Sequence, residues 1–144
     1  MQYKLEQPIL AKIGLEKYQC TIEWRNGRII ADESVATGGR DTGPNPGDLL
    51  LSSLASCTLI TLRMYIDHKG WTIPEIAVKV NLYQETKDEN LITFIDRDIV
   101  FPDLVDPVQM QRLIEVAQRC PISKILENKV QIQTTINTTN GKGS

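Results

Sequence analysis

The fold is decided by residues 45–70, NPGDLLLSSLASCTLITLRMYIDHKG. Asn45 can cap a helix, Pro46 suits the first helical turn because that turn needs no N–H from it, and Asp48 stands at the capping-box position. Gly70 supplies the left-handed residue at which helices commonly end. This stretch therefore predicts a long helix between Pro46 and the glycine.

Apolar residues occupy more than one face of the predicted helix. Leu50, Leu54 and Cys57 share one face by their i, i+4 and i+7 spacing, while other leucines and isoleucines fall elsewhere around it. Residues 49–66 are long enough for a membrane span, but they include several serines and threonines and Arg63. We interpret the segment as a core helix buried nearly all round and expect no membrane association.

Alternating apolar residues predict strands before the helix. Tyr18 to Trp24 alternate with polar residues, and Asn26-Gly27 offers a two-residue turn into a strand over residues 28–33. An earlier strand over residues 9–14 is expected to pair alongside this hairpin.

Further elements follow the helix. Residues 76–83 and 91–101 alternate as strands, Asp106 and Pro107 mark the start of a second helix, and Pro121 begins a short helical segment. Residues 130–136 alternate as a closing strand. This order is an α+β pattern.

Composition limits the size and the class of the protein. A chain of 144 residues with 41% hydrophobic content fits one compact domain over residues 1–144, with a polar tail from about residue 138. The net charge is −2 and no basic stripe is present, which argues against nucleic acid. The first residues lack a basic-then-apolar leader, so we expect a cytoplasmic protein with reduced thiols.

The three cysteines are widely spaced, which argues against a disulfide framework and a zinc site. The single histidine, His68, offers no hydrolase triad. We therefore expect no metal and no cofactor. Cys20 faces the apolar side of a strand and is interpreted as structural.

Cys57 and Cys120 both face inward from helices that must share one small core, so a close approach is plausible. A thiolate that attacks a peroxide becomes a sulfenic acid, and a second thiol must trap it as a disulfide before over-oxidation. Each cysteine can also be read as a small apolar residue of the core. Both readings stay open at this point.

A buried thiolate needs stabilisation. Cys120 precedes Pro121 at a helix start, which suits a leaving thiolate. Cys57 needs a cation from another segment, and the candidate is Arg40 in the glycine-rich loop of residues 37–43. Six extended residues at about 3.3 Å each just cover the distance from this loop back to Cys57. Asp48 is the candidate to orient Arg40. The alternative is that the loop is only a flexible polar connection.

Two separated motifs resemble those of a known family. Residues 43–57, GPNPGDLLLSSLASC, with TLRM at 61–64 and KGW at 69–71, resemble the signature around the first cysteine of OsmC/Ohr proteins (osmotically inducible protein C, organic hydroperoxide resistance). AQRCPIS at 117–123 resembles the segment around the second cysteine. Gly47 stands where the Ohr branch has a glutamate, so the sequence is more similar to the OsmC-like redox branch.

The resemblance implies an OsmC-like fold with curved antiparallel sheets around a long buried central helix, in an intertwined homodimer. It also implies a thiol peroxidase that reduces organic hydroperoxides, or hydrogen peroxide, with Cys57 as the peroxidatic and Cys120 as the resolving cysteine. An external dithiol, lipoyl-type in the Ohr branch, would restore the enzyme. The alternative function is a non-catalytic homodimer that binds small apolar ligands or senses redox state.

Overall fold

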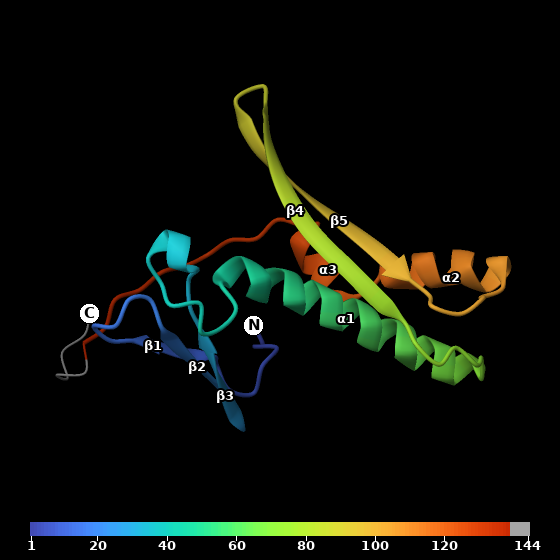
Figure 1. The fold of residues 1–144 in the computed structure, drawn as a ribbon, viewed down its shortest axis with the longest axis horizontal. Coiled ribbons are helices and arrows are strands. Elements are labelled where there is room, and N and C mark those ends of the chain that lie inside the picture. Colours follow the sequence, from blue (N-terminus) through green and yellow to red (C-terminus); the bar gives the residue numbers. More distant parts are fainter. Residues whose placement is uncertain (139–144) are drawn as a thin grey trace. The chain divides into compact units, whose positions relative to one another are not determined.

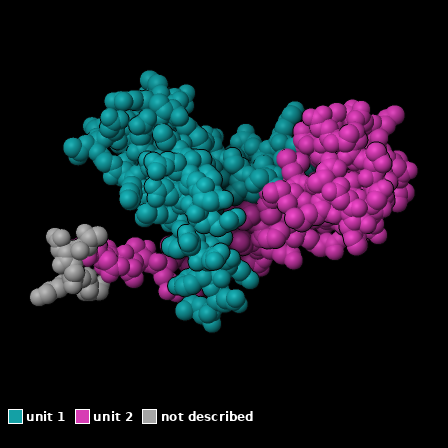
Figure 2. Space-filling view, turned by 90° about the horizontal axis from the view of Figure 1, so that it is seen from below, with its two compact units in different colours: residues 1–56, 78–100 teal, residues 57–77, 101–144 magenta. Residues whose placement is uncertain are grey.

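The computed structural model describes residues 1–138, and the chain divides into two compact units (Figure 2). Unit 1 comprises residues 1–56 and 78–100, and unit 2 comprises residues 57–77 and the chain from residue 101 onward. Helix α1 (Pro46–Lys69) contributes its first part to unit 1 and the remainder to unit 2. The polar tail expected from about residue 138 lies outside the described residues, and the single-domain expectation stays a prediction.

Unit 1 contains a three-stranded antiparallel sheet of β1 (Leu10–Ile13), β2 (Cys20–Trp24) and β3 (Gly27–Ala31), in that order (Figure 1). This confirms the three strands predicted before the helix.

The turn between β2 and β3 lies one residue earlier than predicted. Trp24 pairs with Gly27, so the two turn residues are Arg25 and Asn26 instead of Asn26 and Gly27. A Cβ at position 27 would clash with the indole ring of Trp24. Gly27 therefore makes room for the Trp24 ring that packs on it. The geometry of the turn does not require a glycine at this position.

The cap of α1 is the predicted capping box. The Asn45 N–H donates to the Asp48 carboxylate at 3.0 Å, and the Asp48 N–H donates to Asn45 Oδ1 at 2.8 Å. At the other end Gly70 has the left-handed φ of 68°. The reciprocal bonds satisfy two N–H groups that a helix start leaves unpaired.

The burial of α1 differs from the expectation. One stripe is buried, formed by Leu54, Thr58, Leu62 and Ile66 at intervals of four residues, whereas Met64 is 68% exposed. The prediction of a helix buried nearly all round is wrong for the single chain, because one chain covers only this stripe. By length and composition alone α1 could cross a membrane, a property that core helices of globular proteins share.

Strands β4 (Ala77–Lys87) and β5 (Asn90–Val100) form a long two-stranded hairpin (Figure 1), so both strands predicted after the helix are confirmed. Asp88 at its tip has a left-handed φ of 51°. The predicted closing strand over residues 130–136 is wrong, because residues 129–138 carry no regular secondary structure. Alternation gives a segment one apolar face, but a strand also needs a neighbouring strand to pair with.

Unit 2 contains α2 (Pro107–Ala117), α3 (Pro121–Leu126) and the later part of α1. Asp106 caps α2 as predicted, since its carboxylate accepts from the N–H groups of Val108 and Gln109 at 2.9 and 3.2 Å. The buried apolar side chains of this unit are Leu62, Ile66, Ile73, Leu113, Val116, Ala117 and Cys120. The overall class is α+β, with antiparallel sheets and a long helix, as predicted.

Candidate functional site

The structure brings together the two cysteines singled out by the sequence. Cys57 and Cys120 lie 3.7 Å apart, and both are free thiols. A disulfide bond measures about 2.05 Å, so the pair is in the reduced, contacting state. Cys57 on α1 is half-buried, whereas Cys120 is fully buried. Cys57 is therefore the more exposed residue of the pair.

Cys120 owes its position to the break between α2 and α3. A residue before proline is driven out of the helical region, and Cys120 accordingly has φ −62° and ψ 142° as the N-cap of α3. In this conformation its sulfur accepts from the Ser123 N–H at 3.4 Å. The cysteine thus occupies the place of the usual serine or aspartate cap.

Hydroxyl groups complete the surroundings of Cys120. The Ser123 Oγ lies 3.0 Å from the sulfur, and the Thr58 Oγ1 lies 3.9 Å from it. Thr58 is fully buried and Ser123 nearly so. Two helices therefore place hydroxyl groups beside one buried sulfur.

The electrostatic balance at Cys120 favours the charged form. Burial raises the pKa of the Cys120 thiol, but hydrogen bonds from Ser123, Cys57 and Thr58 outweigh that effect and lower the pKa below its ordinary value. Hydrogen bonds to a thiolate are charge-assisted and therefore strong. The surroundings of the buried sulfur therefore favour its thiolate form more than burial alone would.

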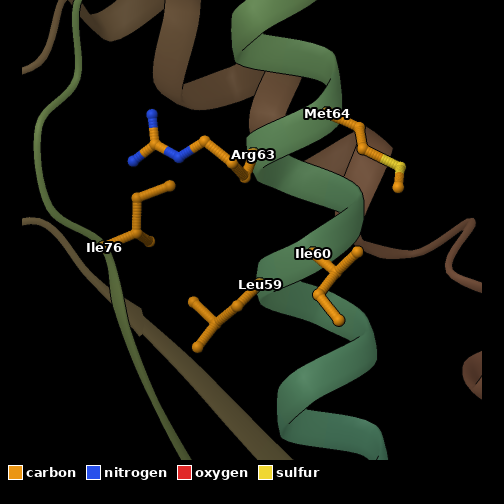
Figure 3. A pocket seen from close by; sticks show the side chains of 5 residues that line it. All are labelled: Leu59, Ile60, Arg63, Met64 and Ile76. Carbon is orange, nitrogen blue, oxygen red and sulfur yellow. The ribbon is translucent and has the colours of Figure 1, made fainter.

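An apolar pocket of about 370 Å³ lies on α1 beyond the thiol pair. Its lining consists of Leu59, Ile60, Arg63, Met64 and Ile76 (Figure 3). The guanidinium of Arg63 donates to the Pro74 carbonyl at 3.2 Å and pairs with Asp67 at 3.7 Å. Ile60 follows Cys57 by three residues, so one edge of the pocket shares a helix face with the thiol.

The structure places Arg40 and Asp48 in unit 1, each with a partner there. The Arg40 guanidinium pairs with Glu16 at 3.4 Å and is largely exposed. Asp48 accepts the Asn45 N–H in the helix cap. The carboxylate that pairs with Arg40 is Glu16, which sequence reasoning did not single out. Catalytic roles for Arg40 and Asp48 stay predictions.

Asp32, which sequence reasoning did not single out, organises the loop that carries Arg40. Its carboxylate is buried and accepts the Thr42 hydroxyl and the N–H groups of Tyr18, Glu33, Arg40 and Thr42. The Thr42 hydroxyl lowers the pKa of Asp32 most, burial raises it, and the backbone N–H groups lower it further, to a value far below the usual range. An aspartate directly after a strand and before a glycine-rich loop was the available signal.

Ser123 and Thr58 were also missed as members of the site. Ser123 follows Cys120 by three residues, which is the spacing from a helix cap to its third residue. Thr58 lies in the i, i+4 stripe of Leu54 and Leu62, where a polar residue calls for a buried partner. Among residues 1–138 no group of three His, Cys, Asp or Glu side chains could hold a metal.

Comparison with known proteins places these features in context. A family model described as OsmC-like protein matches residues 38–135. No curated protein matches the chain.

Several solved structures share the fold. A candidate osmotic stress induced and detoxification response protein from Psychrobacter arcticus has a TM-score of 0.70 at 20% identity, over 87% of this chain and 91% of that one. An OsmC like protein from Mycoplasma pneumoniae has a TM-score of 0.66 at 23% identity, over 87% and 89%. The organic hydroperoxide resistance protein OhrB of Bacillus subtilis has a TM-score of 0.56 at 25% identity, over 82% and 87%.

Proposed function

Because the chain belongs to the OsmC-like protein family, we propose that it is a cysteine-based thiol peroxidase that reduces organic hydroperoxides through Cys57 and Cys120. The observation that carries the proposal is the 3.7 Å approach of a half-buried thiol to a fully buried one whose pKa is lowered. The similarity to OhrB, named for organic hydroperoxide resistance, supports the substrate class.

In this proposal the two sulfurs have different tasks. Cys57, the accessible one, attacks the terminal peroxide oxygen as a thiolate, the O–O bond breaks, and the alcohol leaves with a proton. Cys120 then attacks the sulfenic sulfur of Cys57, a disulfide forms, and water leaves. An external dithiol, lipoyl-type by family resemblance, takes up the oxidising equivalents and returns both thiols.

The proposal includes a cytoplasmic homodimer. The exposed apolar residues of α1, among them Ile60 at 55% and Met64 at 68% exposure, support an assembly that covers this face. Sedimentation equilibrium at micromolar concentration is expected to give a dimer mass, and a monomer mass at all concentrations would remove this part of the proposal.

Arg40 is proposed to stabilise the Cys57 thiolate and the peroxide, with Asp48 as its orienting group. Arg40→Met is then expected to slow peroxide consumption at least tenfold. Arg28→Met, on strand β3, is the matched control and should keep the wild-type rate. An unchanged rate in Arg40→Met would show that this arginine has no role in the reaction and only pairs with Glu16.

The peroxidase test is turnover of cumene hydroperoxide and hydrogen peroxide with a dithiol reductant. Activity is expected to disappear in Cys57→Ser, to stall after one turnover in Cys120→Ser, and to persist in the control Cys20→Ser. Mass spectrometry of the oxidised protein should find a Cys57–Cys120 bridge. Oxidation of Cys57 no faster than that of free cysteine would contradict the proposal.

The apolar pocket supports the second candidate, a non-catalytic binder of small apolar ligands that senses redox state. Its 370 Å³ volume and four apolar lining side chains suit such a ligand. Two results together would favour this candidate. The protein would bind a fluorescent fatty acid and lose this binding in Met64→Glu, and it would not turn over peroxide.

A further inference from the structure

More polar groups surround the Cys120 sulfur than a resolving cysteine needs in order to lie close to its partner. Three side chains from two helices lie within hydrogen-bonding distance of one sulfur: Cys57 and Thr58 from α1, and Ser123 from α3. The Ser123 main-chain N–H also donates to this sulfur. A core cysteine that only fills space needs no such donors.

We propose that Ser123, assisted by Thr58, is a positioning residue that stabilises the Cys120 thiolate released when the disulfide opens and thereby directs the external thiol to Cys57. The inference rests on the proposed redox function of the pair. It adds a role for two hydroxyl groups and the direction in which the disulfide opens.

The direction follows from the chemistry of thiol–disulfide exchange. The external thiolate attacks the sulfur of Cys57, the more exposed residue of the pair. The Cys57–Cys120 bond breaks, and its electron pair goes to the Cys120 sulfur. The second thiol of the external dithiol then displaces Cys57 from the mixed disulfide, which leaves an oxidised dithiol and two reduced cysteines. A leaving sulfur that is better stabilised as a thiolate leaves faster.

The Ser123 hydroxyl is placed to give that stabilisation. At 3.0 Å from the sulfur it is nearer than the N–H at 3.4 Å or the Thr58 hydroxyl at 3.9 Å. Because the sulfur and both hydroxyls are buried, water cannot take the place of a lost donor without entering the core. Removal of the Ser123 hydroxyl should therefore act on the charged form of Cys120 more than on the fold.

The first experiment measures the charge directly and needs no peroxide. In a Cys20→Ser, Cys57→Ser background Cys120 is the only thiol, and its ionisation is followed by thiolate absorbance at 240 nm. Ser123→Ala should raise the pKa of Cys120 by about one unit, which is about a tenfold loss of thiolate at neutral pH. Ser123→Thr should restore the original titration, and Ser56→Ala, which removes an exposed hydroxyl next to the site, should leave it unchanged.

The second experiment measures the leaving group. Diamide forms the Cys57–Cys120 disulfide in the otherwise intact chain, and dithiothreitol reduces it under pseudo-first-order conditions. Reduction should be about three- to tenfold slower in Ser123→Ala than in wild type or Ser56→Ala, because the rate falls as the leaving thiol becomes more basic.

These results separate the inference from the proposed peroxidase. An unchanged Cys120 titration in Ser123→Ala, or equal reduction rates, would overturn the positioning role even if peroxide turnover is confirmed. A raised pKa with slower reduction supports it even if turnover fails. If Ser123→Ala does not fold by circular dichroism, Thr58→Val carries the same two measurements with a smaller expected effect.

Discussion

Oxidation of the thiol pair is expected to stabilise the protein. A Cys57–Cys120 disulfide closes a loop of about 60 residues, for which chain entropy gives about 4 kcal/mol at 25 °C. The sulfurs are 3.7 Å apart in the reduced chain and must approach by roughly 1.7 Å, which costs part of that gain. We therefore expect a net gain of about 3 kcal/mol.

Urea unfolding followed by circular dichroism tests this value. With a slope of about 2 kcal/mol per molar urea, the midpoint of diamide-oxidised protein should lie about 1.5 M above that of reduced protein. Cys57→Ser, taken through the same oxidation, is the control and should show no shift. The reasoning is refuted if protein with a mapped Cys57–Cys120 bridge unfolds at the same urea concentration as reduced protein, or at a lower one.

Other perturbations probe the two units separately. Leu113→Ala in the core of unit 2 should lower the free energy of unfolding by about 3 kcal/mol. The control Val108→Ala, at an exposed position of the same helix, should change it by less than about 0.5 kcal/mol. Equal effects of the two substitutions in chemical denaturation would contradict the placement of Leu113 in the core. Asp32→Asn in unit 1 should lower Tm at pH 7, because the Thr42 hydroxyl and the backbone N–H groups favour the carboxylate and hold the pKa of Asp32 below its ordinary value. A depressed pKa gives stability that is complete above about pH 4 and is lost as pH falls toward the folded-state pKa. The difference in Tm between wild type and Asp32→Asn, measured by calorimetry, should therefore be smaller at pH 3 than at pH 7. A constant difference would argue against a role of the carboxylate charge.

The helix boundaries show how much local sequence can predict. The helix start at Asn45-Pro46-x-Asp48 depends on hydrogen bonds between residues three positions apart, and the helix end depends on the φ of Gly70. Both are local properties, so they could be predicted without knowledge of the rest of the chain. The cap at Asp106 and the strands of the hairpins belong to the same class of prediction.

Predictions that required a partner elsewhere in the chain were less successful. Alternation over residues 130–136 indicated a strand, but pairing depends on a neighbour that the segment itself does not contain. The turn before β3 moved by one residue because the Trp24 ring occupies the face of Gly27. Arg40 pairs with Glu16, a residue distant in sequence that local patterns did not indicate.

For the thiol pair, the sequence by itself determined that Cys57 lies within a long helix and that Cys120 stands at a helix start before a proline, because helical periodicity and caps are local properties. Only the tertiary structure decided that they approach to 3.7 Å and that Cys120 is the fully buried member. It also decided that hydroxyl groups of Thr58 and Ser123 surround the buried sulfur. Distances and pKa shifts depend on which side chains from remote segments meet in three dimensions, and local sequence patterns do not contain that information.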